Sequence, residues 1–320
     1  MVDLSVVIVN WNTRELLRAC LASLNVGARG ISFEVFVVDN ASADGSAEMV
    51  AESFPEAVLV RNAENVGFSR ANNQALRAAT GRHVLLLNSD TVVHEESLSS
   101  LVKYLDENAA VGAVGPKLLN GDGTVQREGF YRRFPSLTQV ALFYTPLRRL
   151  SSRFPGLVRR FWEDFDEARS MEVDQIPGAA LCVRGELLER VGLLEERFAI
   201  WFEDVDWCYR AKGMGARLMY YPGATITHLG GQSFGLWREQ AKMLQLFSSM
   251  YLFFRIHHGR IQAECMRGII LSATAASVAI NFLRKWLRLP GFRAQDYEAR
   301  KWLIRNFSRV GLQLRLPTAS

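Results

Sequence analysis

The sequence lacks several signals that would place it in other protein classes. Its four cysteines (Cys20, Cys182, Cys208 and Cys265) include no CxxC pair and no zinc spacing, and scattered cysteines in a chain of 320 residues suit a reducing compartment, with disulfides left as the open alternative. The N-terminus has no basic start, long apolar run or small-residue cleavage site, so we predict no signal peptide and expect a cytoplasmic protein. With 49% hydrophobic and 22% charged residues the chain is too apolar to be disordered.

Charge is distributed unevenly along the chain. Residues 251–320 contain 12 Lys/Arg and three acidic residues, a net charge of +9, whereas the first 250 residues carry a net charge of −4. A basic segment of this kind indicates an anionic partner, either a membrane surface or a nucleic acid.

The first 120 residues alternate strand and helix signals. Short apolar runs rich in β-branched residues predict strands at 4–9, 35–38, 58–60 and 84–87, and apolar stripes at helical spacing predict helices at 13–24, 47–54 and 69–79. Thr13 is a candidate N-cap for the first helix. Alternation of this kind predicts a mostly parallel sheet with helices on both faces, whose ligands bind beyond the carboxyl ends of the strands.

Polar clusters stand where three of the four predicted strands end. They are Asn10-Trp11-Asn12, Asp39-Asn40-Ala41-Ser42 and Asn88-Ser89-Asp90. Packing alone does not select Asn and Asp repeatedly at the ends of buried strands, so these clusters predict a ligand site at one edge of the sheet.

The pattern is irregular from residue 121 to 173. Three arginine pairs, Arg132-Arg133, Arg148-Arg149 and Arg159-Arg160, are interleaved there with aromatic residues, and we interpret this stretch as an insertion or mobile region near an acceptor. Residues 176–183 predict a loop leading into a strand. Residues 217–220 predict a further strand that ends at a turn, Pro222-Gly223.

After residue 235 the pattern is helical. Residues 243–256 are very apolar, and a second apolar run at 269–283 is flanked by Arg267 and Arg284. That run has about 15 residues, fewer than the ~20 that span a bilayer. The segment is either an interfacial helix, with Trp286 at the headgroups, or a helix packed on a soluble domain with a solvated basic face.

Asp90 is a candidate ligand for Mg²⁺ or Mn²⁺, which prefer hard oxygen ligands, although a lone strand-end Asp is also a common turn or cap residue. Gly67, in the loop that starts at Asn65, allows close backbone approach to an anion, and Arg70 would contact phosphate. The alternative is a capped helix with a solvated arginine. His228 would complete a metal site or be structural.

Three carboxylates, Glu203, Asp204 and Asp206, are crowded among aromatic residues that include Trp201. Acids near apolar surface have raised proton affinity, which suits a general base, and sugars stack on aromatic faces. The alternative is a helix start, where acids complement the dipole.

The order of these motifs resembles glycosyltransferase family 2, within it the rhamnosyltransferase-type branch that builds bacterial cell-surface polysaccharide. The matching motifs are VVIVNWN (6–12), VVDNASADGS (37–46), NVGFSRANN (65–73), LLLNSD (85–90), IPGAALCVR (176–184) and FEDVDWCYR (202–210). The resemblance implies an α/β GT-A (nucleotide-diphospho-sugar transferase) fold, in which a mostly parallel central sheet is flanked by helices, with a basic helical C-terminal extension.

The resemblance also implies roles for the site residues. Asp39 would bind the nucleotide base, Asp90 the divalent metal, and Asp204 would be the catalytic base. The family's aspartate-rich metal motif is reduced here to Asn88-Ser89-Asp90, which favours His228 as a second ligand. The remaining expected nucleotide-sugar contacts are Asn10, Trp11, Asn40, Asn65, Gly67, Arg70, Asn88 and Ser89, and the acceptor-side contacts are Trp201 and Glu203.

The expected reaction adds one sugar at a time, because the QxxRW motif of processive members is missing. It is expected to invert the anomeric configuration, because one displacement occurs without a covalent intermediate. The resemblance to this branch implies that the sugar is L-rhamnose from dTDP-rhamnose and that the acceptor is polyprenyl-linked or a glycan. It also implies a cytoplasmic enzyme that is peripheral on the inner face of the plasma membrane. We expect a catalytic domain over 1–235, with a nucleotide-binding half (1–120) and an acceptor half (170–235), and a basic helical region over 236–320 facing an anionic membrane surface.

Three other functions fit the sequence less well. A dinucleotide-binding oxidoreductase requires a glycine-rich turn after the first strand, and Asn10-Trp11-Asn12 contains no glycine. A nucleic-acid binder would leave the acidic strand ends without a role, so no nucleic-acid partner is expected. A catalytically degenerate nucleotide- or lipid-binding relative would have lost the base or a metal ligand, whereas Asp204, Asp90 and His228 are all present.

Overall fold

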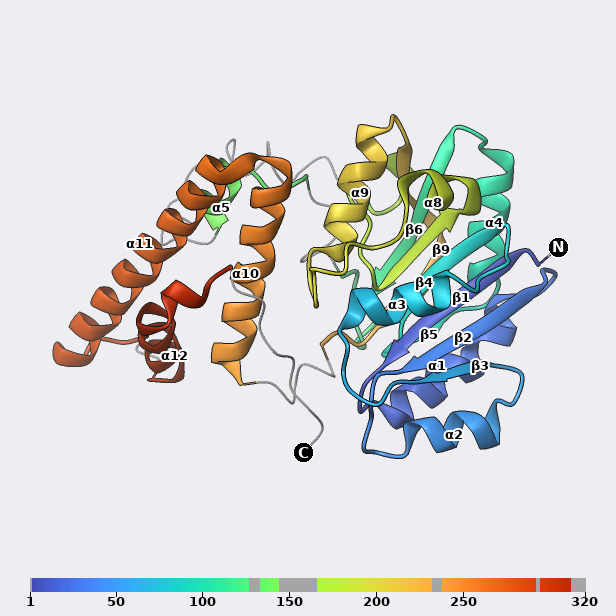
Figure 1. Cartoon of the computed structure of the whole chain (residues 1–320), viewed down its shortest axis with the longest axis horizontal. Helices are drawn as coiled ribbons and strands as arrows, with labels where there is room; N and C mark the ends of the chain where they lie inside the picture. The colour runs from blue at the N-terminus through green and yellow to red at the C-terminus, as the bar shows by residue number, and fades with distance from the viewer. Residues whose placement is uncertain (1, 127–132, 144–165, 232–237, 292–293, 312–320) are drawn as a thin grey trace. The chain divides into compact units, whose positions relative to one another are not determined.

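The computed structural model describes residues 2–126, 133–143, 166–231, 238–291 and 294–311 (Figure 1). The chain divides into two compact units. The first contains Met1–Phe134 and Phe165–Leu236 with Leu316–Ser320, and the second contains Pro135–Asp164 and Trp237–Arg315. Of the arginine pairs in the irregular stretch, Arg133 is described, and Arg132, Arg148, Arg149, Arg159 and Arg160 lie outside the described residues.

The first half of unit 1 is a parallel β/α arrangement. Its strands pair side by side in the order β3-β2-β1-β4, all parallel, which confirms the alternation predicted from the apolar runs. The elements are β1 (Leu4–Asn10), α1 (Arg14–Gly27), β2 (Phe33–Asp39), α2 (Ser46–Ser53), β3 (Val58–Arg61), α3 (Phe68–Leu76) and β4 (His83–Asn88).

Beyond β4 the sheet becomes mixed. Strands β8, β6, β9 and β5 continue the order, with β8 antiparallel to β4 and β6, and β5 antiparallel to β9. Within the described ranges the sheet has nine strands, and β7 pairs with β9. These elements are β5 (Thr91–Val93), α4 (Ser97–Glu107), β6 (Val111–Leu119), β7 (Met171–Glu172), β8 (Ala180–Arg184), α8 (Gly185–Val191), α9 (Glu203–Gly213) and β9 (Arg217–His228).

The core of unit 1 lies on both faces of this sheet. Every residue of β1 is buried, and alternate side chains enter opposite layers, with Leu4, Val6 and Ile8 on one face and Val7 and Val9 on the other. Helices α1, α2 and α4 cover the first face, and α3, α8 and α9 cover the second. Strands buried on both faces read as continuous apolar runs, which is why they could be predicted.

The turn predicted at Pro222-Gly223 is wrong. Strand β9 continues through both residues to His228, and its pairing with β6 shifts register there, as at a β-bulge. The Tyr221 ring stacks on Tyr104 at 4.3 Å between centroids. A Cβ on Gly223 would lie 2.3 Å from that Tyr221 ring, so glycine is required by packing.

Unit 2 is helical in its described part. Helix α5 (Leu137–Phe143) packs against α11 (Gly259–Trp286), and α11 also packs against α10 (Glu239–His257) and α12 (Ala294–Arg305). The 15-residue apolar run predicted a shorter helix than the 28-residue α11, because the helix continues through charged residues on both sides of the run. By length and composition alone α11 is long and apolar enough to cross a membrane.

Candidate active site

The ends of β1, β2 and β4 lie side by side at one edge of the sheet. In the parallel register Asn10 is opposite Asp39, and Val9 is opposite Asn88. The strand-end polar clusters predicted from the sequence therefore meet, and Asn10 and Asp39 are both buried.

A hydrogen-bond network joins these strand ends. The Asn10 side-chain amide donates to Asp39 Oδ1 at 3.2 Å and to Ser42 Oγ at 3.1 Å. The Thr13 hydroxyl donates to Asn10 Oδ1 at 2.6 Å and lies 2.9 Å from Ser89 Oγ. Asn10, on β1, is thus tied to the ends of both neighbouring strands.

Thr13 does not have the capping role that was predicted for it. It stands at the N-cap position of α1, but its side chain makes no cap hydrogen bond. The backbone N–H of Arg14 is instead satisfied by Asp44 Oδ2 at 2.8 Å. The Thr13 hydroxyl bonds to Asn10 and Ser89 instead, because these are buried polar groups that need hydrogen-bond partners.

Asn40 and Asn65, both predicted as nucleotide-sugar contacts, are joined by a hydrogen bond. The Asn40 amide donates to Asn65 Oδ1 at 2.8 Å, and Asn65 Oδ1 also accepts the Gly67 N–H at 3.1 Å. Gly67 has φ 93°, a conformation that favours glycine. The Trp11 indole N–H is buried and lacks a hydrogen-bond partner within the described residues, as expected for a donor that a ligand satisfies.

Arg70 lies in an ion pair. Its Nε is 3.2 Å from Glu196 Oε2, and Arg77 Nη2 is 3.0 Å from the other oxygen of Glu196. A contact between Arg70 and phosphate would require Arg70 to leave Glu196, so the predicted phosphate role stays a prediction.

Asp90 and His228 lie together where β5 begins and β9 ends. Antiparallel pairing puts Thr91 opposite His228, and the Asp90 Oδ1 to His228 Nε2 distance is 3.3 Å, with each side chain less than a tenth exposed. His228 Nδ1 is 2.9 Å from Gln126 Oε1, an acceptor. A neutral imidazole that donates from Nδ1 to Gln126 directs its Nε2 lone pair toward Asp90 and toward the Asn88 side-chain amide, 3.3 Å away.

The donor set fits a divalent cation that is shared with a substrate. A lone pair and a carboxylate facing one another over 3.3 Å repel unless a proton or cation lies between them. The described residues contain no group of three or more His, Cys, Asp or Glu that could hold a metal. Two protein ligands with phosphate oxygens and water completing the sphere is the usual arrangement for Mg²⁺, and Gln126 would orient the imidazole.

The acidic motif begins at a backbone turn of unusual conformation. Trp201 and Phe202 have φ of 61° and 72°, a left-handed conformation that costs non-glycine residues about 1 kcal/mol or more each. Helix α9 starts directly after them at Glu203. Consecutive residues of this kind cluster at functional sites, where surrounding contacts hold the strain.

Asp204 is held by two backbone donors. Its Oδ2 accepts the Gly178 N–H and its Oδ1 accepts the Val205 N–H, both at 2.7 Å. Burial raises the pKa of Asp204 against the opposing effect of these hydrogen bonds. Each carboxylate oxygen of Asp204 keeps a free lone pair. Asp204 is therefore a carboxylate of fixed orientation with raised proton affinity.

Glu203 differs from its two acidic neighbours. It is 6% exposed, and its Oε2 has no hydrogen-bond partner among the described residues. Burial, followed by the charges of Asp204 and Asp206, raises the pKa of Glu203 well above its ordinary value. Asp206 is instead paired with Arg210 at 2.9 Å inside α9.

Helix α3 fixes the segment that precedes the acidic turn. Asn73 exchanges two hydrogen bonds with the backbone of Leu194, at 2.8 and 3.0 Å. The Ser69 hydroxyl donates to Phe198 O at 2.5 Å, and the Phe68 N–H donates to Ala199 O at 2.7 Å. The sequence motif from Asn65 to Asn73 therefore positions the 194–199 segment, a role that was not predicted from the sequence.

The segment at Gly178 and Ala179 connects the two ends of the site. Gly178 donates its N–H to Asp204, and the Ala179 carbonyl accepts the Asn88 N–H at 3.1 Å. Gln126, Thr13 and Gly178 were not predicted as site residues. Gln126 and Gly178 carry no local signal of this role, whereas the hydroxyl of Thr13 directly after a polar strand end was a signal that could have been used.

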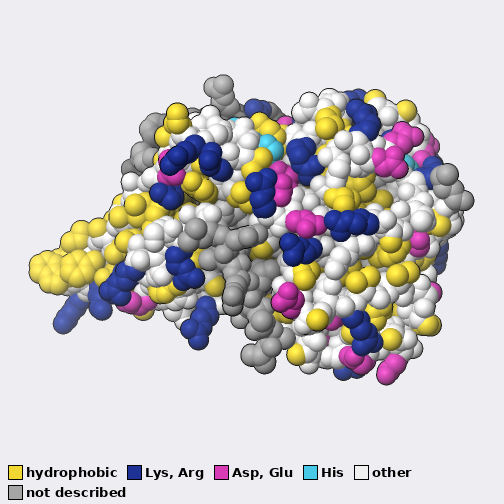
Figure 2. Space-filling model, in the orientation of Figure 1, with side chains coloured by type: hydrophobic (Ala, Val, Ile, Leu, Met, Phe, Trp, Pro, Cys, Tyr) yellow, Lys and Arg dark blue, Asp and Glu magenta, His cyan; other side chains and the backbone are white. Residues whose placement is uncertain are grey.

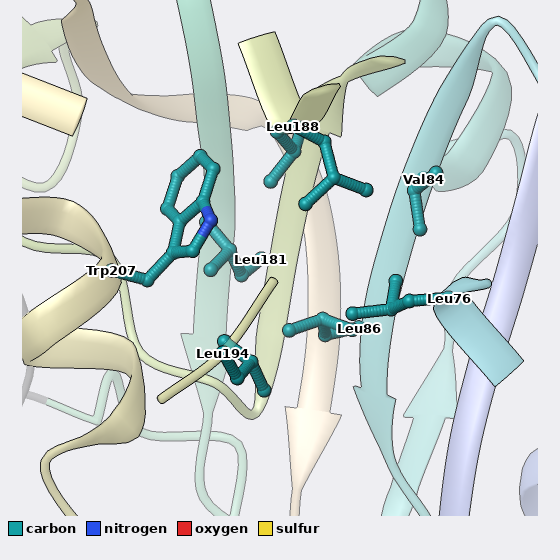
Figure 3. A pocket seen from close by; sticks show the side chains of 8 residues that line it. Leu76, Val84, Leu86, Leu181, Leu188, Leu194 and Trp207 are labelled. Carbon is teal, nitrogen blue, oxygen red and sulfur yellow. The ribbon is translucent and has the colours of Figure 1, made fainter. Parts of the chain in front are cut away.

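An apolar cavity lies in the core on the second face of the sheet, away from these polar groups (Figure 3). The side chains that point into it come from α3, β4, β8, the loop between α8 and α9, and α9 itself: Leu76, Leu86, Leu181, Leu194 and Trp207. Its volume of about 10 Å³ is at the lower limit for a single water molecule. The Trp207 N–H is satisfied by Gly192 O at 2.9 Å, so this gap is a packing feature.

Relatives of known function have similar sequences. An N-acetylglucosaminyl-diphospho-decaprenol L-rhamnosyltransferase from Mycobacterium tuberculosis is 27% identical over 269 residues, covering 80% of this chain and 85% of the relative. A low-salt glycan biosynthesis hexosyltransferase, Agl10, from Haloferax volcanii is 24% identical over 214 residues, covering 66% of this chain and 62% of the relative.

Solved structures show the same fold. The mannosyltransferase PcManGT from Pyrobaculum calidifontis, in complex with GDP-Man and Mn²⁺, superposes with a TM-score of 0.57 at 19% identity, covering 98% of this chain and 90% of that one. The sequence profile of Glycosyl transferase family 2 matches residues 5–164. The chain therefore belongs to glycosyl transferase family 2, and it is a GT-A glycosyltransferase similar to the rhamnosyltransferase branch.

Proposed function

We propose that the protein transfers one sugar from a nucleoside diphosphate sugar to an acceptor hydroxyl, with Asp204 as the base and inversion at the anomeric carbon. The observation that carries the proposal is the connection of Asn88 and Asp204 through Gly178 and Ala179. Through this connection the end of β4, where the donor would bind, and the oriented carboxylate of Asp204 are held by two adjacent residues, Ala179 and Gly178.

The reaction follows from these groups. Asp204 accepts the proton of the acceptor hydroxyl, whose oxygen forms a bond to the anomeric carbon. The bond between that carbon and the diphosphate oxygen breaks, and its electron pair leaves with the nucleoside diphosphate. A single displacement inverts the configuration. The raised pKa of Asp204 strengthens it as a base, and its two N–H donors fix its direction.

We infer a divalent cation, Mg²⁺ or Mn²⁺, held by Asp90 and His228. When bound, it would stabilise negative charge on the leaving diphosphate. Asp39 would contact the nucleotide base, with Asn10, Trp11, Asn40, Asn65, Gly67, Asn88 and Ser89 lining the donor end. Trp201 and Glu203 would face the acceptor. PcManGT and GalNAc-T7, another structure with this fold, were both solved with Mn²⁺, which supports a metal here.

For the donor sugar we propose L-rhamnose from dTDP-rhamnose, and for the acceptor a polyprenyl-linked or glycan hydroxyl in cell-surface polysaccharide synthesis. The mycobacterial relative is an L-rhamnosyltransferase whose name includes a decaprenol-linked acceptor, which supports L-rhamnose as the sugar and a polyprenyl-linked acceptor. Unit 1 would be the catalytic domain and unit 2 the region that associates with the cytoplasmic face of an anionic membrane.

The base is tested with Asp204→Asn. Transfer should fall by at least about a thousandfold, because no other group would accept the proton, while donor binding persists. Donor binding is read separately as the rise in melting temperature with dTDP-, UDP- or GDP-sugars and Mn²⁺. Asp166→Asn, an exposed acid in the same unit, is the matched control.

Near-normal turnover of the Asp204→Asn variant would remove Asp204 as the base. A melting temperature that rises with nucleotide-sugars while the wild-type chain transfers nothing to any acceptor would favour the degenerate binder instead. Full activity after treatment with EDTA would remove the metal.

A further inference from the structure

The last twelve residues of α11, Ala275–Trp286, include no buried side chain. The residues of α11 that are buried end at Thr274, and all residues from Ala275 to Gly291 are half-buried or exposed. We call Ala275–Trp286 and the three residues that follow it, through Leu289, the bare end of α11. In Figure 1 this end extends past the other helices of its own unit.

Large hydrophobic side chains are concentrated there. Of the eleven that are exposed in the described residues, six lie between positions 280 and 289: Ile280, Phe282, Leu283, Trp286, Leu287 and Leu289. Trp286 is 71% exposed. Figure 2 shows hydrophobic side chains gathered at this tip, and a cluster of this kind in water indicates an interaction surface.

Apolar and basic residues of the bare end lie on opposite sides. At about 100° per residue, Ile280, Phe282, Leu283 and Trp286 fall within an arc of about 160°. Arg284 and Lys285 project from the other side, and Arg288 follows directly after the helix. The dark-blue basic side chains in Figure 2 lie along one side of the hydrophobic tip.

The length of the bare end decides between spanning a membrane and lying on it. Ala275–Trp286 contains 12 helical residues, which measure about 18 Å and are too short for a hydrocarbon core of about 30 Å. The first half of α11 cannot supply the rest without unpacking, because Ala263, Met266 and Ile270 are buried in unit 2.

We propose that the bare end of α11 inserts side-on into the interface of a bilayer that contains anionic lipids. Its apolar face would enter the acyl region, and Arg284, Lys285 and Arg288 would contact the phosphates. This deepens the membrane partner of the proposed function and rests on that function for its biological purpose. The net charge of +9 over residues 251–320 supports an anionic surface as the occupant.

The test is flotation of the full chain with vesicles of phosphatidylcholine alone or mixed equally with phosphatidylserine. The double variant Phe282→Ser, Trp286→Ser should lose on the order of tenfold or more in binding. Ile261→Ser is its matched control, because Ile261 is 81% exposed on the same helix but lies outside the bare end.

The charge component is tested with Arg284→Glu, Lys285→Glu, which should reduce binding to anionic vesicles to the level seen with neutral ones. Lys103→Glu, an exposed lysine of α4, is the control and should bind like the wild type. High salt should release the wild-type chain from anionic vesicles, as expected for an interfacial helix.

Three outcomes would overturn the proposal. The serine double variant binding as well as the wild type would remove the bare end as the membrane contact. Resistance of the bound chain to salt and to alkaline carbonate would indicate a spanning helix. A lipid-free dimer that the same substitutions abolish would show that a second copy covers this face. Because binding is measured without transfer, failure of the glycosyltransferase proposal would leave this result unchanged.

Discussion

The backbone N–H of Gly178 donates a hydrogen bond of 2.7 Å to Oδ2 of Asp204. The next residue along the chain, Ala179, accepts the backbone N–H of Asn88. Two short contacts from adjacent residues thus hold the start of α9 against the end of β4. The distance between the end of β4 and the start of α9 is therefore set by backbone geometry rather than by long side chains.

Replacing Asn73 with alanine should lower both stability and turnover. The variant leaves the backbone N–H and carbonyl of Leu194 without their partners, at a cost on the order of 2–4 kcal/mol in the free energy of unfolding. Loosening of the 194–199 segment should reduce kcat about tenfold or more with little change in the donor's KM. Denaturant unfolding and steady-state kinetics measure the two effects.

The control is Asn72→Ala, on the same helix. Asn72 is equally buried, and within the described part of the chain its side chain donates only to the Phe68 carbonyl of its own helix. Equal losses of kcat in both variants would mean that Asn73 acts through the stability of α3 alone, and not through Leu194.

Replacing Gln126 with alanine should weaken the metal site without removing a ligand. Loss of the acceptor for His228 Nδ1–H frees the imidazole to rotate or change tautomer. We expect the Mn²⁺ concentration for half-maximal activity to rise about 10- to 100-fold. Gln175→Ala, which removes a half-buried glutamine of the same unit that bonds to the Arg133 carbonyl, should leave that concentration unchanged. An unaltered metal requirement in the Gln126 variant would argue against His228 as a ligand.

Replacing Glu203 with glutamine should stabilise the fold increasingly as pH rises. A carboxyl whose pKa is raised on folding binds its proton more tightly in the folded state, so its ionisation destabilises that state above the unfolded pKa of about 4.5. The melting temperature of the wild type should therefore fall relative to the variant from about pH 5 upward. Parallel melting curves across that range would mean that Glu203 ionises without cost.

Thiol titration should find one fast-reacting cysteine in the folded chain. Cys20, Cys182 and Cys208 are buried, and burial raises the pKa of both Cys20 and Cys182 to about 12, whereas Cys265 is exposed. With a chromogenic disulfide, one thiol should react rapidly and four after denaturation. Cys265→Ser should abolish the fast phase, and a fast phase that survives would place a reactive thiol elsewhere.

The strands in the first half of unit 1 could be predicted because a strand that is buried on both faces consists of a short run of apolar residues, as in β1 and β4. Their parallel order then brought Asn10, Asp39 and Asn88 to one edge. The antiparallel insertion of β8 between β4 and β6 could not be predicted, since pairing partners far apart in sequence leave no local pattern. The turn predicted at Pro222-Gly223 was wrong for a different reason: β-bulges and turns favour the same residue types, so the sequence does not distinguish them.

Asp90 and His228 were predicted as partners, and the structure brings them within 3.3 Å. Their contact depends on the pairing of β5 with β9, which sequence spacing does not reveal. The role of Gln126 and the hydrogen bonds from Asn73 to Leu194 could not be predicted for a related reason. The sequence does not show whether an amide side chain faces water or bonds to a group that is distant along the chain.

The ties among Thr13, Asn10 and Ser89 have a thermodynamic consequence for ligand recognition. The protein's own hydrogen bonds already lock the three strand ends together, so a nucleotide docking there would not need to freeze them. Association would then lose little conformational entropy at this surface, and its rate should be governed by diffusion and orientation more than by rearrangement.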